Sequence, residues 1–210
     1  SQRKGDPIDS RRAPAYLTDT PPLEASMNYR QLGRSALKVS ELCLGTMNFG
    51  IPGQGHQGDW TLDLDQSREI FRAAIDNGLF YFDCADFYGI GACEEIVGQL
   101  LREMLPREDY VLTTKVAMPM GSNPNTMGLS RKHIIEGVDN SLKRLGLDYI
   151  DQLLIHRHPH GIPFHINTPI EETMEALNDL VRAGKVLYLG GSSMFAWQFT
   201  QLQMTAEING

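Results

Sequence analysis

The chain of 210 residues is long enough to bury one sizeable hydrophobic core, and its length allows one or two domains. Hydrophobic residues make up 41% of it, yet no apolar run approaches the roughly 18 to 20 residues of a membrane span, which excludes a transmembrane protein. The formal net charge of −7 argues against a nucleic-acid-binding surface, which is normally basic.

Three cysteines, Cys43, Cys84 and Cys93, are odd in number and lack CxxC spacing. They indicate neither a disulfide framework nor a metal site, so we expect no bound metal and a reducing, cytoplasmic setting.

Residues 1–26 are polar and rich in proline, without the apolar segment of a secretory signal. We interpret them as a flexible N-terminal extension, followed by one domain over residues 27–210.

Short apolar runs alternate with amphipathic helical segments from Glu41 onward, which is typical of βα units around a parallel sheet. Ser130 is a candidate N-cap of the third helix, and Thr168, Pro169 and Glu171 resemble a capping box with proline in the first turn. Glycines fall where three helices are expected to stop, at Gly78, Gly146 and Gly184. The predicted strands lie at residues 42–46, 79–83, 110–116, 149–156 and 186–192.

Polar side chains lie at the C-terminal ends of these strands: Thr46, Asp83, Lys115, His156 and Ser192. In a closed (β/α)8 barrel the strand ends meet at one rim, where active sites of that fold lie, whereas in an open sheet they spread along an edge. The pattern favours a TIM barrel. Such a domain needs roughly 250 residues, so this chain holds only its first five βα units and we expect it to be part of a longer protein.

Three of these residues, together with Tyr88 on the loop after Asp83, suggest a mechanism. A buried charge needs a partner, and pairing Lys115 with Asp83 provides one, although a plain buried salt bridge would satisfy the same need. An ammonium next to Tyr88 would lower the pKa of its phenol, while His156 would donate a hydrogen bond to a substrate carbonyl and keep an adjustable charge. Such a site could protonate an oxyanion as it forms. No side chain supplies a hydride, which implies a nicotinamide cofactor.

Several blocks in order resemble the aldo-keto reductases, particularly the microbial, fungal and potassium-channel β-subunit branch. They are "CLGTMNFG" (43–50), "FDCADFYG" (82–89), "TTKV" (113–116), "GLSRKHIIEGVDNSLKRLGLDYIDQLLIHR" (128–157) and "LGGSS" (189–193). The resemblance runs from about Met27 to Gly210.

The resemblance implies an (α/β)8 barrel that binds NADPH and reduces an aldehyde or ketone, with Tyr88 as general acid and Asp83, Lys115 and His156 as its partners. It also implies that Ser192 and Ser193 hold the nicotinamide carboxamide, and that Gly45, Thr46, Met47 and Asp83 lie beside the cofactor. The channel β-subunits commonly carry asparagine at the position of His156, so its presence favours a working reductase over a regulatory subunit.

Other interpretations remain open. "HRHPH" (156–160) could ligate a divalent metal in a barrel hydrolase, but Pro159 interrupts strand geometry, and a solvent-facing loop explains the two further histidines as well.

"YGIGACEE" (88–95) has Glu94 where a dinucleotide-binding loop has its third glycine, so we expect Gly89 and Gly91 to form a flexible loop that places Tyr88. We expect Asp86 to be an ordinary loop carboxylate. The partners expected are a small carbonyl substrate and, because the outer strands would be open, a chain that covers the sheet edges.

Overall fold

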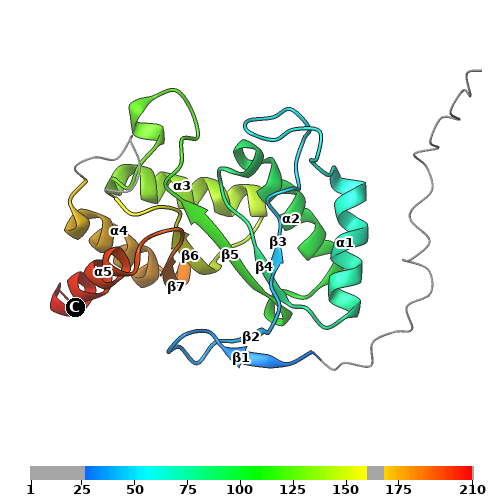
Figure 1. The fold of residues 1–210 in the computed structure, drawn as a ribbon, viewed down its shortest axis with the longest axis horizontal. Helices are drawn as coiled ribbons and strands as arrows, with labels where there is room; N and C mark the ends of the chain where they lie inside the picture. Colours follow the sequence, from blue (N-terminus) through cyan, green and yellow to red (C-terminus); the bar gives the residue numbers. More distant parts are fainter. Residues whose placement is uncertain (1–26, 160–167, 210) are drawn as a thin grey trace, which may run out of the picture.

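The computed structural model describes residues 27–159 and 168–209, and Figure 1 shows their arrangement. Five parallel strands form one sheet in sequential order. They are β3 (Leu44–Gly45), β4 (Tyr81–Asp83), β5 (Val111–Val116), β6 (Ile150–Ile155) and β7 (Val186–Gly191). A sequential, all-parallel order is what the first five units of a (β/α)8 barrel require. The expected extension at residues 1–26 lies outside the described residues.

Five helices follow these strands, and each contacts the next, so that they form an arc along the sheet (Figure 1). They are α1 (Leu64–Asp76), α2 (Ala92–Met104), α3 (Arg131–Leu145), α4 (Ile170–Arg182) and α5 (Ala196–Asn209). Their apolar stripes bury Phe71, Val97 and Ile134 against strand residues such as Phe82 and Leu112. The predicted alternation of strands and helices is therefore present.

The strands are shorter than the apolar runs predicted. Strand β3 keeps only two of the five residues expected at 42–46, and β4 only three of the five at 79–83. Thr46, His156 and Ser192 consequently lie one residue beyond strands β3, β6 and β7 rather than inside them.

Four of the predicted helix ends are confirmed and one is wrong. Gly78 and Gly184 directly follow the C-caps of helices α1 and α4, as predicted. Ser130 is the N-cap of α3, where its side chain accepts a hydrogen bond from the N–H of His133, and Gly146 ends the helix in the left-handed conformation. At α4 the N-cap is Pro169, with no side-chain hydrogen bond, so the capping box expected at Thr168 does not form.

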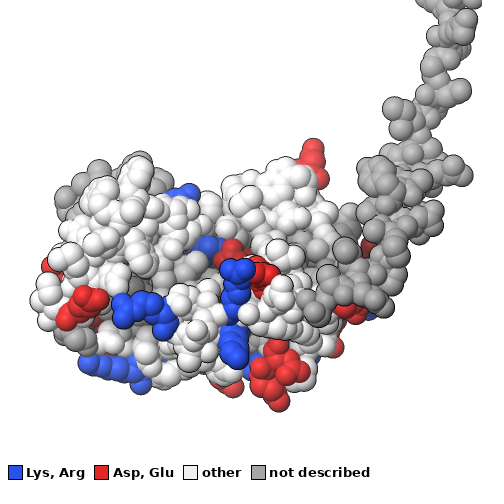
Figure 2. All heavy atoms as spheres, turned by 60° about the horizontal axis from the view of Figure 1, so that its bottom comes forward, with Lys and Arg blue, Asp and Glu red and all other residues white. Residues whose placement is uncertain are grey.

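A β-hairpin that sequence analysis did not predict precedes the sheet. Its strands β1 (Tyr29–Gln31) and β2 (Lys38–Ser40) are antiparallel and mostly exposed, so they lack the apolar alternation that would reveal them. The N–H of Phe80 donates to Ser40 Oγ, which places the hairpin at the N-terminal end of β4. Figure 2 turns the bottom of Figure 1 forward and shows acidic and basic side chains next to one another there.

A buried ion pair lies near this end of the sheet. Arg107 Nη2 is 2.6 Å from Asp151 Oδ2, and the guanidinium sits between the rings of Tyr110 and Tyr149, at 4.7 and 3.9 Å from their centroids. Asp151 also accepts from the N–H of Leu112. This cluster joins β5 to β6 away from the polar strand ends.

Among the described residues, no helix is both long and apolar enough to cross a bilayer.

Candidate active site

Lys115 is the centre of the candidate site. It lies next to the end of β5, and its ammonium donates to Asp83 Oδ2 at 2.7 Å, to the carbonyl of Cys84 at 2.8 Å and to Tyr88 Oη at 3.2 Å. Burial lowers the pKa of Lys115, but the charge of Asp83 and the hydrogen bonds outweigh it and leave that pKa above its ordinary value. Lys115 is therefore charged.

The parallel register explains why Asp83 meets Lys115. Asp83 pairs with Thr113, and Lys115 lies two residues further along β5, so both side chains point to the same face of the sheet. The Lys115 side chain is 5% exposed and the Asp83 side chain 29%. The ion pair thus has its cation buried and its carboxylate partly open to the site.

Tyr88 begins a short 3-10 helix, Tyr88–Gly91, in the loop that follows β4. Gly89 and Gly91 adopt positive φ angles of 59° and 95° and are buried, so this turn is packed rather than the flexible loop expected. The prediction that Lys115 lowers the pKa of Tyr88 is wrong in its net direction. Burial raises that pKa, and the attraction of Lys115 offsets it only in part.

His156 completes the group. It follows β6, and its main-chain N–H donates to the carbonyl of Val116 at 2.9 Å. Its imidazole ring packs edge-on against the ring of Tyr88, with ring centroids 5.7 Å apart. Burial, followed by the charges of Lys115 and Arg157, lowers the pKa of His156 to about 3. The expected adjustable charge is therefore wrong, because the imidazole stays neutral near pH 7.

The residues expected beside a cofactor lie on the same rim. Thr46 follows β3 and donates both its N–H, at 3.0 Å, and its hydroxyl, at 2.9 Å, to the carbonyl of Asp83. It thereby fixes the chain between Gly45 and Met47, and Met47 is half exposed. The N–H of Ser192 donates to the carbonyl of Ile155 at 2.9 Å, which places that serine next to His156.

The serine pair fits a carboxamide. The hydroxyls of Ser192 and Ser193 lie 3.2 Å apart, and the Ser193 side chain is exposed. Hydroxyls can both donate and accept, which matches the amide and carbonyl groups of a nicotinamide carboxamide. The side chains on the rim are therefore compatible with the nicotinamide half of the expected cofactor.

Sequence reasoning missed a buried cluster behind Tyr88. Asp86 is 1% exposed, so the expectation of an ordinary loop carboxylate is wrong. Glu94, in the first turn of α2, is completely buried and accepts from Thr114 and Arg144. These contacts join residues 20 and 50 positions apart, so no local spacing could have indicated them.

Two further predictions concern histidines. His158 is 1% exposed and its ring lies 6.0 Å from that of Trp197, so the solvent-facing loop expected there is wrong at His158, while His160 lies outside the described residues. The described part of the chain contains no group of three or more potential metal ligands. His56 is exposed and stacks on Phe87 with ring centroids 4.6 Å apart.

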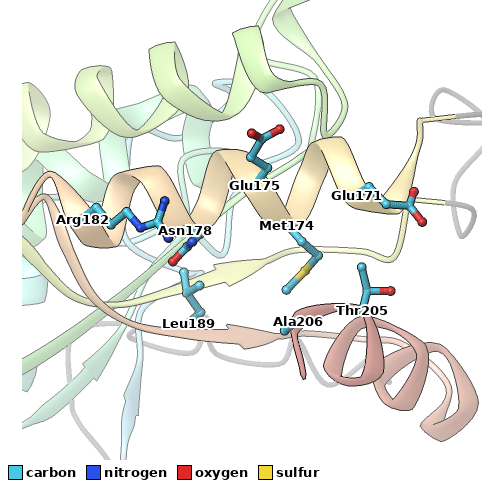
Figure 3. Close-up of a pocket in the computed structure, with 8 residues that line it drawn as sticks. All are labelled: Glu171, Met174, Glu175, Asn178, Arg182, Leu189, Thr205 and Ala206. Carbon is cyan, nitrogen blue, oxygen red and sulfur yellow. The ribbon is translucent and has the colours of Figure 1, made fainter. Parts of the chain in front are cut away.

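A cavity of about 370 Å³ lies between α4, β7 and α5, and Figure 3 shows its lining side chains. Met174 and Leu189 form its apolar part, and Glu175 and Arg182 its charged part. None of the predicted site residues lines it. We therefore place the candidate chemistry at the polar strand ends rather than in this cavity.

A parallel α/β barrel segment with a tyrosine, a lysine, a carboxylate and a histidine at its C-terminal rim defines the class of protein. Residues 41–209 match the family model described as the Aldo/keto reductase family. The chain therefore belongs to the aldo/keto reductase family, which confirms the resemblance seen in the sequence.

Relatives support this membership. The chain is 42% identical over 202 residues to versiconal hemiacetal acetate reductase of Aspergillus parasiticus, covering 88% of this chain and 56% of that protein. It is 41% identical over 205 residues to aldo-keto reductase AMT2 of Alternaria alternata, covering 86% and 53%. It is also 41% identical over 183 residues to a "Probable voltage-gated potassium channel subunit beta" of Arabidopsis thaliana, covering 86% and 51%. The chain thus spans about half the length of these relatives.

A solved structure shows the same architecture. The crystal structure of the thermostable aldo-keto reductase Tm1743, in complex with the inhibitor epalrestat, superposes with a TM-score of 0.68 at 30% identity. The match covers 86% of this chain and 59% of that one. The predicted fold, a (β/α)8 barrel represented by its first five units, is confirmed.

Proposed function

We propose that the protein to which this chain belongs reduces an aldehyde or ketone to an alcohol with NADPH, and that Tyr88 is the general acid. The observation that carries the proposal is the position of the Lys115 ammonium, within hydrogen-bond distance of both Asp83 and Tyr88. The preference for NADPH over NADH rests on the family resemblance. The substrate class is a small carbonyl compound.

The proton would come from the tyrosine. Because burial raises the pKa of Tyr88, its phenol is protonated near pH 7, which is the form that a general acid needs. As the carbonyl oxygen gains negative charge, Tyr88 Oη would donate its proton to it. The Lys115 ammonium then stabilises the phenolate left behind, and Asp83 holds Lys115 in place.

His156 would orient the substrate. Its neutral imidazole can donate one hydrogen bond to the carbonyl oxygen without bringing a second positive charge beside Lys115. Its ring, edge-on against Tyr88, sets the angle between the two donors. Together the two side chains form a preorganised site for a developing oxyanion.

A nicotinamide cofactor would supply the hydride when bound. We propose that Ser192 and Ser193 hold its carboxamide, and that Gly45, Thr46, Met47 and Asp83 lie along its ring. The support for this assignment is that both groups lie at the rim, next to His156 and Asp83.

We also propose that further βα units or a partner chain cover the outer strands. In the described sheet, β3 and β7 each pair on one side only, and such edges invite pairing. Sedimentation of the purified chain tests the second alternative, since a strictly monomeric chain would contradict coverage by a second copy. The three free cysteines support a reducing, cytoplasmic location, which cell fractionation can check.

The test of the activity is NADPH consumption, followed at 340 nm with a panel of aldehydes. We expect turnover by the wild type and at least about 10²-fold less by Tyr88→Phe, which keeps the ring and removes the acid. Cofactor binding without any turnover would contradict the proposal and favour a regulatory subunit. Turnover of an ester or amide that chelators abolish and NADPH does not affect would favour a metal-dependent hydrolase.

A further inference from the structure

The carboxyl group of Asp86 is buried and poorly satisfied. It lies between Asp83 and Tyr88 in the chain and is 1% exposed. Neither carboxyl oxygen makes a geometrically complete hydrogen bond within the described residues, and the adjacent main-chain N–H of Phe87 stabilises the charged form only in part. The main-chain N–H of Asp86 donates to the carbonyl of Lys115 at 3.3 Å. The backbone of Asp86 is thus fixed to the catalytic strand while its side chain is sealed from solvent. An ionised carboxylate is strongly disfavoured in such a place.

The side chains around it form a cluster that joins three elements. Glu94, in the first turn of α2, accepts from Thr114 Oγ1 at 2.6 Å and from Arg144 Nε at 2.7 Å. Thr114 is the residue before Lys115, and Arg144 belongs to α3. The Arg144 side chain passes so close to Gly91 that a Cβ there would lie 2.5 Å from Arg144 Cδ. The cluster therefore packs against the turn that carries Tyr88.

The charges in this cluster do not balance if both carboxyl groups are ionised. The charged groups that act on Asp86 are Glu94 from α2, Arg144 from α3 and Lys115 from β5. Arg144 is already paired with Glu94, and Lys115 with Asp83. A charge on Asp86 would therefore be uncompensated and would repel Glu94.

We propose that Asp86 is a positioning residue, held as a neutral carboxylic acid, whose ionisation would displace the Tyr88 turn from Lys115. Burial, followed by the charge of Glu94, raises the pKa of Asp86 well above 3.8, and Arg144 offsets only part of this. The consequence for catalysis rests on the function proposed above. The protonation state of Asp86 does not.

The first test needs no activity. The unfolding of the wild type is compared with that of Asp86→Asn, a neutral isostere. The control is Glu95→Gln, which removes an exposed carboxylate from the first turn of α2, next to Glu94. Unfolding releases the Asp86 proton, so from about pH 5 upward the unfolding equilibrium constant of the wild type should rise relative to Asp86→Asn by roughly tenfold per pH unit. Glu95→Gln should stay parallel to the wild type. Parallel curves for wild type and Asp86→Asn would overturn the proposal.

Infrared spectroscopy keeps the proposal testable if Asp86→Asn does not fold. With aspartate labelled by 13C, the wild type at neutral pH should show the C=O stretch of one protonated carboxylic acid beside the carboxylate bands. A spectrum with carboxylate bands alone would overturn the proposal.

Kinetics test the positioning role. Asp86→Ala, which leaves a cavity behind the turn, should lower kcat by at least about tenfold with an unchanged KM, and Asp86→Asn should restore it. Equal losses in both variants would contradict the neutral-acid role. An inactive full-length protein would refute the proposed function, while the unfolding and infrared results would still decide the state of Asp86.

Discussion

Replacing Lys115 by methionine tests the charge at the centre of the candidate site. The substitution keeps an unbranched apolar chain of the length of lysine up to Cε and removes the ammonium that contacts Asp83, Cys84 and Tyr88. Without that charge, the phenolate formed when Tyr88 gives up its proton loses its nearest stabilising group. The pKa of Tyr88, already raised by burial, should rise further.

The size of the effect follows from the 3.2 Å between Lys115 Nζ and Tyr88 Oη. At an effective dielectric constant of 20, two unit charges at that separation attract by about 5 kcal/mol, which sets an upper limit. Hydrogen bonds to charged groups contribute about 1.5–3 kcal/mol net when removed by mutation. The smaller range applies because solvent can enter the space of the lost ammonium. We therefore expect kcat to fall by about 10- to 160-fold.

The assay is steady-state carbonyl reduction together with an ultraviolet titration of tyrosinate. Lys185→Met is a matched control, because the ion pair of Lys185 with Asp139 has both side chains 38% exposed and should contribute less than about 1 kcal/mol. A Lys115→Met variant with the kcat of the wild type and an unchanged tyrosine titration would refute the reasoning.

Three further predictions concern other residues of the chain. Arg107→Ala leaves the buried Asp151 without its cation and should lower the free energy of unfolding, measured in urea, by about 3–5 kcal/mol. The control Arg30→Ala, at an exposed ion pair, should lower it by less than about 1 kcal/mol, and equal losses in the two variants would contradict the prediction. Folding lowers the pKa of His156 from 6.5 to about 3, so the unfolded state binds more protons between these values; stability should fall as pH decreases from 6.5, and less steeply in His156→Asn. A Cβ at Gly45 would have no neighbour within 4 Å, so Gly45→Ala should change the free energy of unfolding by less than about 0.5 kcal/mol. Calorimetry should nevertheless show weaker NADPH binding, and an unchanged affinity would remove Gly45 from the proposed cofactor site.

The order of the strands and the meeting of Asp83 with Lys115 could be predicted from the sequence. Both follow from local patterns, namely apolar runs of strand length and polar residues at their C-terminal ends, which a parallel sheet brings to one edge. The chemistry of the residue types suggested the roles of Tyr88 and His156, and the family resemblance implied the same roles. The contact of Tyr88 with Lys115 agrees with that assignment in position, at 3.2 Å.

The features that the sequence could not indicate are set by burial and by contacts between residues far apart in the chain. The net pKa shifts of Tyr88 and His156 are set mainly by how much protein covers them, which has no local signal. The partners of Glu94 come from β5 and α3, and Asp86 is buried although its neighbours in the sequence give no sign of it. At Thr168 the residue types of a capping box were present, but the helix begins after Pro169 instead.

The most direct test of the central claim follows one atom from the cofactor to the product. The chain is incubated with NADPH deuterated at C4 and an aldehyde, and the alcohol is analysed by mass spectrometry. We predict that the wild type transfers one deuterium to the carbonyl carbon and that Tyr88→Phe, with the same cofactor affinity, transfers it at least about 10²-fold more slowly. Equal transfer by the two proteins, or an alcohol without deuterium, would contradict a tyrosine that protonates the carbonyl as the hydride arrives.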